Sequence, residues 1–123
     1  MEYIRHSYIA GLHHYLIVSW DCEVNGWQVG IAAMPSKRLA KRYAGGRFEH
    51  EADVAERTNS PGRVNIGWFL RQLNAIMTDL NYKFGSQLWM AYAVDAQRHR
   101  VYKHILSKRG WLESSSRSMI YYG

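Results

Sequence analysis

The sequence Thr58-Asn59-Ser60-Pro61-Gly62-Arg63-Val64-Asn65-Ile66-Gly67 leads into the most regular pattern of the chain. From residue 65 to residue 82, apolar residues recur at three- and four-residue steps, which predicts an amphipathic helix with one buried face. The residues of that face are Phe69, Leu73, Ile76, Met77 and Leu80. A glycine-bearing turn before a helix favours anion binding, because unpaired backbone N–H groups and the helix dipole both face the turn.

Strand-like and helix-like segments lie on both sides of this helix. Residues 15–20 and 27–32 predict an antiparallel hairpin, and Asn25-Gly26 between them is typical of a two-residue turn. Residues 1–12 are ambiguous, with a short strand and a turn at Gly11 as one interpretation. Further strands are predicted at residues 48–56, 86–94 and 118–122, and further helices at 37–43 and 96–108. In the last helix we expect Val101 and Ile105 to face inward, with Tyr102 as a third candidate.

The order hairpin, short helix, strand, helix, strand, helix, strand predicts an α/β (α+β) fold. We expect a mixed, mostly antiparallel central sheet flanked by helices. With 123 residues, the chain has the size of a single domain, residues 1–123.

The charge of the chain favours an anionic partner. Its net charge is +6 and its pI is near 9.6, which suits nucleic acid, an acidic protein surface or a phosphorylated cofactor, although the charge could serve solubility alone. The best phosphate-binding candidates lie on the helix expected at 96–108: Arg98, Arg100, Lys103, Lys108 and Arg109. Five tryptophans and nine tyrosines could add stacking, or could belong to the core.

Other classes of protein are disfavoured. Cys22 is the only cysteine, so no intramolecular disulfide can form. The apolar runs are too short to span a membrane, and no signal-peptide pattern stands at the N-terminus, so we expect a cytoplasmic protein. His13 and His14 point to opposite faces of a strand, and no ligand set has zinc spacing, so no metal is expected.

The order of elements and the central turn resemble the GNAT N-acetyltransferase superfamily. That resemblance implies an acetyl-CoA site, because the family carries an Arg/Gln-x-x-Gly-x-Gly/Ala loop whose amides bind the pyrophosphate. The matching segment is Gly62, Arg63, Val64, Asn65, Ile66 and Gly67. Gly67 fits the last position, Asn65 replaces the first glycine as a residue that also enters left-handed conformations, and Gly62 replaces the Arg/Gln.

A second similarity runs from Asp95 to Tyr102 and ends at Gly110-Trp111. Many members of the superfamily use a tyrosine four residues before that glycine as the general acid toward the CoA thiolate. Leu106 occupies this position, and Tyr102, one turn earlier, is the nearest substitute. The same run, with Asn59-Ser60, is similar to phage Mom-type DNA-modification proteins, which share the GNAT architecture. Small phage proteins with a GNAT-like fold and no catalysis are a further relative.

Acyl transfer to an amine needs a base, a stabilised oxyanion and a proton donor for the thiolate. Glu56 is the first choice as base, followed by Glu51 and Asp53, although this acidic strand could instead be solvated or pair with Arg47 and Arg57. Two further residues have alternative interpretations.

Tyr102 is either the acid or a core tyrosine. Asp95 is either a catalytic carboxylate or an N-cap, and Ser60-Pro61 likewise reads as a cap and a first helical residue.

The sequence thus predicts an N-acyltransferase that uses acetyl-CoA and an amine-bearing acceptor on a protein, a small molecule or a nucleic-acid base. The alternative is a non-catalytic, phage-like binding protein whose basic surface docks on nucleic acid or an acidic protein.

Overall fold

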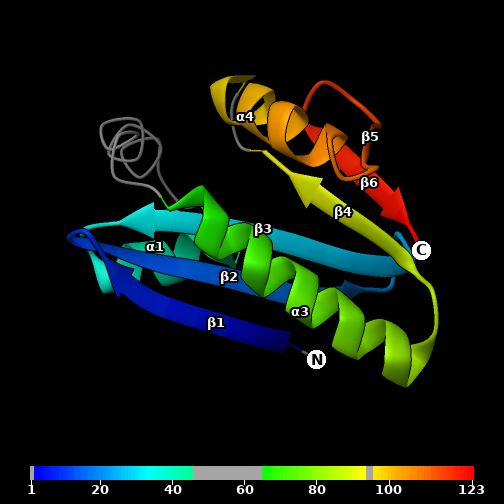
Figure 1. Cartoon of the computed structure of the whole chain (residues 1–123), viewed down its shortest axis with the longest axis horizontal. Coiled ribbons are helices and arrows are strands. Elements are labelled where there is room, and N and C mark those ends of the chain that lie inside the picture. Colours follow the sequence, from blue (N-terminus) through cyan, green and yellow to red (C-terminus); the bar gives the residue numbers. More distant parts are fainter. Residues whose placement is uncertain (1, 46–64, 94–95) are drawn as a thin grey trace.

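The computed structural model describes residues 2–45, 65–93 and 96–123 (Figure 1). The described residues form one mixed sheet of six strands and three helices. In chain order the elements are β1 (Glu2–Ile9), β2 (Leu12–Asp21), β3 (Gly26–Met34), α1 (Lys37–Ala44), α3 (Ile66–Phe84), β4 (Leu88–Tyr92), α4 (Ala96–Ser107), β5 (Leu112–Glu113) and β6 (Ser118–Tyr122). The predicted α+β class, with a mostly antiparallel sheet flanked by helices, is confirmed.

The strands lie in the order β1-β2-β3-β4-β6-β5. Strands β3 and β4 are parallel, and the other four neighbouring pairs are antiparallel. A parallel pair needs a crossover connection, because the chain must return to the same end of the sheet. Here the chain between β3 and β4 contains α1 and α3, so the parallel pair joins an N-terminal meander to a C-terminal three-stranded unit.

Two hairpins build the meander. Between β1 and β2, Ala10 and Gly11 form a two-residue turn with φ values of 52° and 81°, so the turn predicted at Gly11 is confirmed. The two-residue turn predicted at Asn25-Gly26 is wrong, because Asp21 pairs with Gly26 and encloses a four-residue loop. The Asp21 carboxylate accepts a hydrogen bond from the Glu23 N–H (2.9 Å), so the turn starts earlier than expected.

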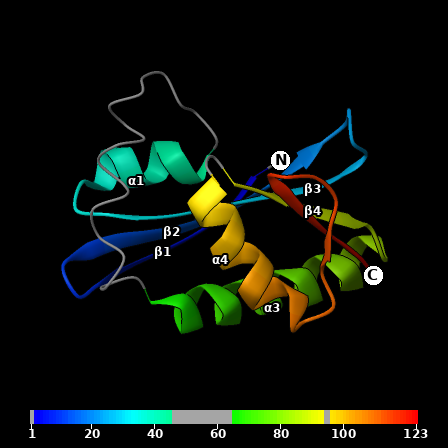
Figure 2. The same cartoon turned by 90° about the horizontal axis from the view of Figure 1, so that it is seen from above.

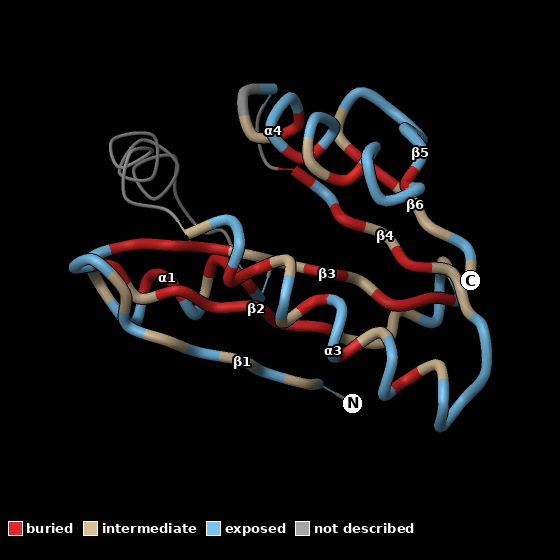
Figure 3. Tube along the Cα trace, viewed as in Figure 1, coloured by how far each residue is buried: buried red, intermediate tan, exposed pale blue. Residues whose placement is uncertain are grey.

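Helices cover the sheet from two sides (Figure 2). On one face, α3 and α4 share a core with β2, β3, β4 and β6. On the other, α1 packs on β2 and β3 and forms a second, smaller core. Strand β2 is therefore buried on both faces along much of its length (Figure 3), which explains why residues 15–18 form an unbroken apolar run rather than an alternating one.

Helix α1 lies very close to the sheet. The Ser36 side chain caps its start by accepting a hydrogen bond from the Leu39 N–H (3.3 Å). Its end meets β3 at Gly30, where an added Cβ atom would stand 1.8 Å from the carbonyl oxygen of Ala44. Only a residue without a side chain allows this approach.

The helix predicted at 65–82 is confirmed as α3. Phe69, Leu73, Ile76 and Leu80 are buried, as is Trp68, and Met77 is partly buried against the same core. In α4 the predicted inward face is partly wrong. Val101 is 43% exposed, and the buried residues are His99, Tyr102 and Leu106, which lie on one side of the helix.

Strands β4 and β6 confirm the predictions at 86–94 and 118–122, and β5 was not predicted. The strand predicted at 48–56 falls outside the described residues. In the described part of the chain, no helix combines the length and the apolar character needed to cross a membrane.

Candidate functional site

The parallel strands β3 and β4 diverge. Their pairing runs from Gly26 with Leu88 to Val29 with Ala91, whereas β3 continues to Met34. Beyond this point, residues 30–34 of β3 pair only with β2 among the described strands. The end of β4 stays with β6, since Tyr92 pairs with Ser118 and the Ala93 N–H donates to the Arg117 carbonyl (2.7 Å). Figure 1 shows the two strands separating towards their carboxyl ends, where α3 and α4 both begin.

The first turn of α3 lies at this end of the sheet. Asn65 is its N-cap, and its Oδ1 accepts a hydrogen bond from the Trp68 N–H (2.9 Å). The backbone N–H groups of Ile66 and Gly67 belong to the first turn, where no acceptor exists within the helix. The first turn contains no acidic residue of its own that would offset the partial positive charge of the helix end.

Two side chains support this turn. The buried His14 of β2 accepts a hydrogen bond at Nε2 from the Asn65 N–H (3.0 Å), and its Nδ1–H donates to the Leu12 carbonyl (3.0 Å). Arg71 lies one turn further along α3, with Nη1 3.2 Å from the point where a Cβ atom on Gly67 would sit. A guanidinium beside two N–H groups that have no acceptor within the helix fits an anion such as a phosphate.

The expected cofactor loop is placed only in part. Gly62, Arg63 and Val64 lie outside the described residues, whereas Asn65, Ile66 and Gly67 open α3. The expectation that Asn65 replaces a left-handed glycine is wrong, because its φ and ψ are −91° and 90°. The residue is extended because its side chain is used to cap the helix.

Of the expected catalytic residues, the structure describes Tyr102. Tyr102 lies on the buried side of α4, with 9% of its surface exposed, and belongs to the larger core together with Leu106. Glu56, its alternatives Glu51 and Asp53, and Asp95 fall outside the described residues.

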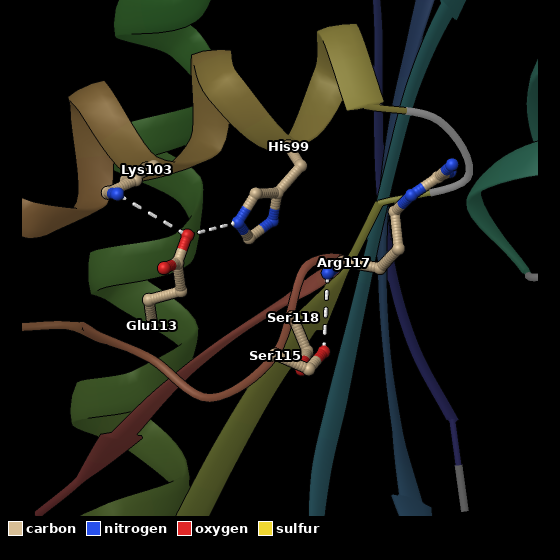
Figure 4. A network of polar contacts seen from close by, with 6 residues as sticks. All are labelled: His99, Lys103, Glu113, Ser115, Arg117 and Ser118. Carbon is tan, nitrogen blue, oxygen red and sulfur yellow. Dashed lines mark hydrogen bonds and ion pairs between the residues drawn. The ribbon is translucent and has the colours of Figure 1, made fainter.

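A polar network links α4 to β5 (Figure 4). The buried His99 donates from Nε2 to Glu113 Oε2 (2.7 Å), and Lys103 Nζ lies 3.5 Å from the same oxygen. The hydrogen bond from His99 lowers the pKa of the Glu113 carboxyl below its ordinary value, against the effect of burial, and the Lys103 charge lowers it further. No described group bonds to His99 Nδ1, which is also buried. The sequence alone did not single out His99, because its partner Glu113 lies 14 residues away in the chain.

The basic residues expected on the helix at 96–108 are mostly exposed. Arg100, Lys103, Lys108 and Arg109 face solvent, and Arg98 is partly buried. Among the residues of α4 there is no acidic side chain, and of the four exposed basic residues Lys103 forms an ion pair with a described carboxylate, that of Glu113. This helix therefore presents a positive surface beside the network of His99 and Glu113.

His6 and His13, on β1 and β2, contact each other. His6 Nε2 and His13 Nδ1 lie 3.1 Å apart, and the His6 ring stacks on Tyr15. Partial burial lowers the pKa of His6 most, and the charge of Lys37 lowers it further. Within the described ranges, no three metal-ligating side chains converge.

Comparison with protein-family models, with curated proteins and with solved structures gives no match.

Proposed function

We propose that this protein is a GNAT-like N-acyltransferase that uses acetyl-CoA and an amine acceptor. The observation that carries the proposal is the divergence of β3 and β4 at Val29 and Ala91, with the first turn of α3 at the same end of the sheet. In sheets with parallel strands and crossover helices, ligands bind outside the carboxyl ends of the strands. The edge of β3 beyond Val29, which no described strand pairs on the side of β4, and the positive end of α3 suit an extended molecule that carries phosphates.

The residues divide between binding and chemistry. The N–H groups of Ile66 and Gly67, with the Arg71 guanidinium, would hold the pyrophosphate. Acetyl-CoA would supply an acyl group activated as a thioester. Tyr102 would donate a proton to the departing thiolate, and Glu56 would accept the proton of the attacking amine. Asp95 is the second proposed carboxylate. Burial of Tyr102 in the core is consistent with its alternative role as a packing residue.

Calorimetric titration with acetyl-CoA and with CoA tests the proposal. We expect micromolar binding, and we expect Gly67→Asp to weaken it at least about tenfold, because a carboxylate would stand beside the phosphates. Arg71→Gln should weaken it as well. Thr78→Asp, which adds the same charge to an exposed position of α3 two turns beyond Arg71, is the matched control and should bind like the wild type. An absence of CoA binding by the wild-type protein would remove the proposal.

The proton donor is tested separately. Tyr102→Phe should lower turnover of a radiolabelled acetyl group onto amines while CoA binding stays unchanged. Full turnover in this variant would leave Tyr102 as a residue of the core.

A second candidate function is non-catalytic binding of a polyanion, either nucleic acid or an acidic protein. The positive surface of α4 and of the turn that follows it favours this function, because Arg100 on the helix and Lys108 and Arg109 in the turn are exposed and the helix carries no acidic residue. Binding through these side chains should weaken steeply as salt rises from about 50 to 200 mM, and it should weaken in the double variant Arg100→Gln/Lys108→Gln. A flat salt response would exclude phosphate contacts.

A further inference from the structure

Half of the sheet has an apolar face that the described helices leave open. Helix α1 packs on β2 and β3, while β4, β6 and β5 continue the same face beyond it. Side chains alternate between faces along a strand, so the register assigns the residues of this face. They are Leu88, Met90, Tyr92, Leu112, Ile120 and Tyr122, named here the aromatic platform.

The platform is ordered by strand pairing. Met90 lies opposite Ile120, which lies opposite Leu112, so these three form a row across β4, β6 and β5. The two tyrosines flank this row. Tyr122 lies opposite Leu88, and Tyr92 lies opposite Ser118, four residues further along the ladder. The tyrosines are therefore separated by about 13 Å along the strands.

Three of the six side chains of the platform are exposed, and Leu88, Met90 and Ile120 are partly buried. Tyr92 is 54% exposed, Leu112 is 69% exposed and Tyr122 is 78% exposed. Isolated exposed apolar residues are common on proteins, but a continuous set on a flat sheet indicates a surface that binds something. The two tyrosine rings give it the means to stack on flat groups.

The charge near the platform favours a polyanion. Helix α1, on the same face, exposes Lys37, Arg38 and Lys41 and contains no acidic residue. Its last residue reaches Gly30 on β3, the strand next to β4. Of the described carboxylates that the register places on this face, Asp21 is engaged by the Glu23 N–H and the Gln28 amide, and Glu2 lies on β1, at the opposite edge of the sheet from β5.

We propose that the aromatic platform binds single-stranded nucleic acid, with bases stacked on Tyr92 and Tyr122 and phosphates near the basic residues of α1. Exposed rings can stack only on bases that are themselves free, and in a duplex the faces of the bases are covered. The net charge of +6 supports the same partner over a second copy of the chain, since two copies would repel each other.

The proposal does not depend on acyl transfer, because the platform residues are not those of the proposed CoA site. It names a surface for the nucleic-acid alternative that differs from α4, which packs on the opposite face. The two surfaces can be separated by mutation.

Fluorescence anisotropy with the full chain and a labelled oligo-dT of about 16 nucleotides tests the platform, since small domains bind roughly this length or less. Tyr92→Ala and Tyr122→Ala should each weaken binding about tenfold, whereas Tyr92→Phe and Tyr122→Phe should retain it. Tyr82→Ala is the matched control, because Tyr82 is a 92% exposed tyrosine on α3. A duplex of the same length should bind more weakly than the single strand.

Several results would overturn the proposal. They are an absence of oligonucleotide binding, equal binding of duplex and single strand, or wild-type affinity in both alanine variants. If affinity falls only in Arg100→Gln/Lys108→Gln, nucleic acid binds on α4 and not on the platform. If sedimentation shows a dimer that Tyr122→Ala dissociates, the platform binds a second copy. Thermal melting of the Tyr→Phe and Tyr→Ala variants shows whether each variant still folds, so that weaker binding by a folded variant can be assigned to the loss of stacking.

Discussion

The buried imidazole of His14 joins the start of β2 to the start of α3 through its hydrogen bond with the Asn65 N–H. Because Nε2 accepts this bond, the ring is neutral and its proton is on Nδ1, which donates to the Leu12 carbonyl. One side chain thus satisfies two backbone groups and fixes the position of the helix end to which we assign phosphate binding.

Replacement of this ring should destabilise the protein. His14→Leu keeps an apolar side chain at the site but leaves the Leu12 carbonyl and the Asn65 N–H without their partner, so we expect a loss of about 1–3 kcal/mol in the free energy of unfolding. Urea denaturation measures it. His104→Leu, at an exposed position of α4, should change stability by less than about 0.5 kcal/mol. Equal effects of the two substitutions would contradict the structural role of His14.

The turn between β1 and β2 offers a stabilising substitution. Ala10 has a φ of 52°, a left-handed conformation that is unfavourable for alanine. Ala10→Asn should raise the free energy of unfolding by about 0.5–1 kcal/mol, because asparagine followed by glycine suits this turn. Gly11→Ala is the opposite control and should lower stability by a similar amount. Thermal melting measures both variants, and the melting temperature must rise for Ala10→Asn and fall for Gly11→Ala.

The contact between α1 and β3 should not tolerate a methyl group. In Gly30→Ala, the new Cβ atom would overlap the Ala44 carbonyl, so α1 must shift and stability should fall by about 1–3 kcal/mol. Gly67→Ala is the comparison: its nearest contact is the flexible end of Arg71, and stability should be unchanged or slightly higher. A neutral Gly30→Ala would mean that α1 does not lie against β3 as described.

Stability should depend on pH through Glu113. Its pKa is lowered in the folded protein, first by the hydrogen bond from His99, so its contribution is complete above the ordinary value of 4.5 and is lost as pH falls through the lower folded value. His99→Gln should therefore reduce the melting temperature most above pH 4.5, and the difference from wild type should narrow in more acidic buffer. Lys103→Met should show the same trend with a smaller difference. If the difference in melting temperature between His99→Gln and the wild type instead grows as the pH falls, Glu113 is not the group responsible.

Elements with one buried face could be predicted from sequence. The spacing of Phe69, Leu73, Ile76 and Leu80 located α3, and the apolar runs located β2 and β6. Strand β1 stayed ambiguous because it is an edge strand in which partly buried and exposed residues alternate without a matching change in polarity. Strand β5 has only two residues, too few for any periodicity to show.

Which residues of α4 are buried could not be predicted from apolar character alone. Val101 was expected inside because it is apolar, and His99 was not, although His99 is buried and Val101 is exposed. The histidine can be buried because Glu113 accepts its hydrogen bond, and that partner comes from β5.

The supporting residues of the candidate site could not be found from the sequence for a similar reason. His14 and Asn65 are 51 residues apart in the sequence, and no local sequence pattern predicts a hydrogen bond between residues so far apart. Arg71 is one turn from Gly67 on the helix. Because it lies opposite the buried face of the helix, its sequence position alone looks like that of any solvent-exposed charged residue.

The smaller of the two cores has a consequence for the order of folding. All its members lie between Tyr15 and Ala44, whereas the larger core draws on residues from Leu12 to Met119. Closing short loops costs less entropy than closing long ones, so we expect β2, β3 and α1 to acquire hydrogen-exchange protection before β4 in a pulse-labelling experiment. During synthesis, we expect β2 and β3 to pack against α1 while β4, the parallel partner of β3, is still in the ribosome.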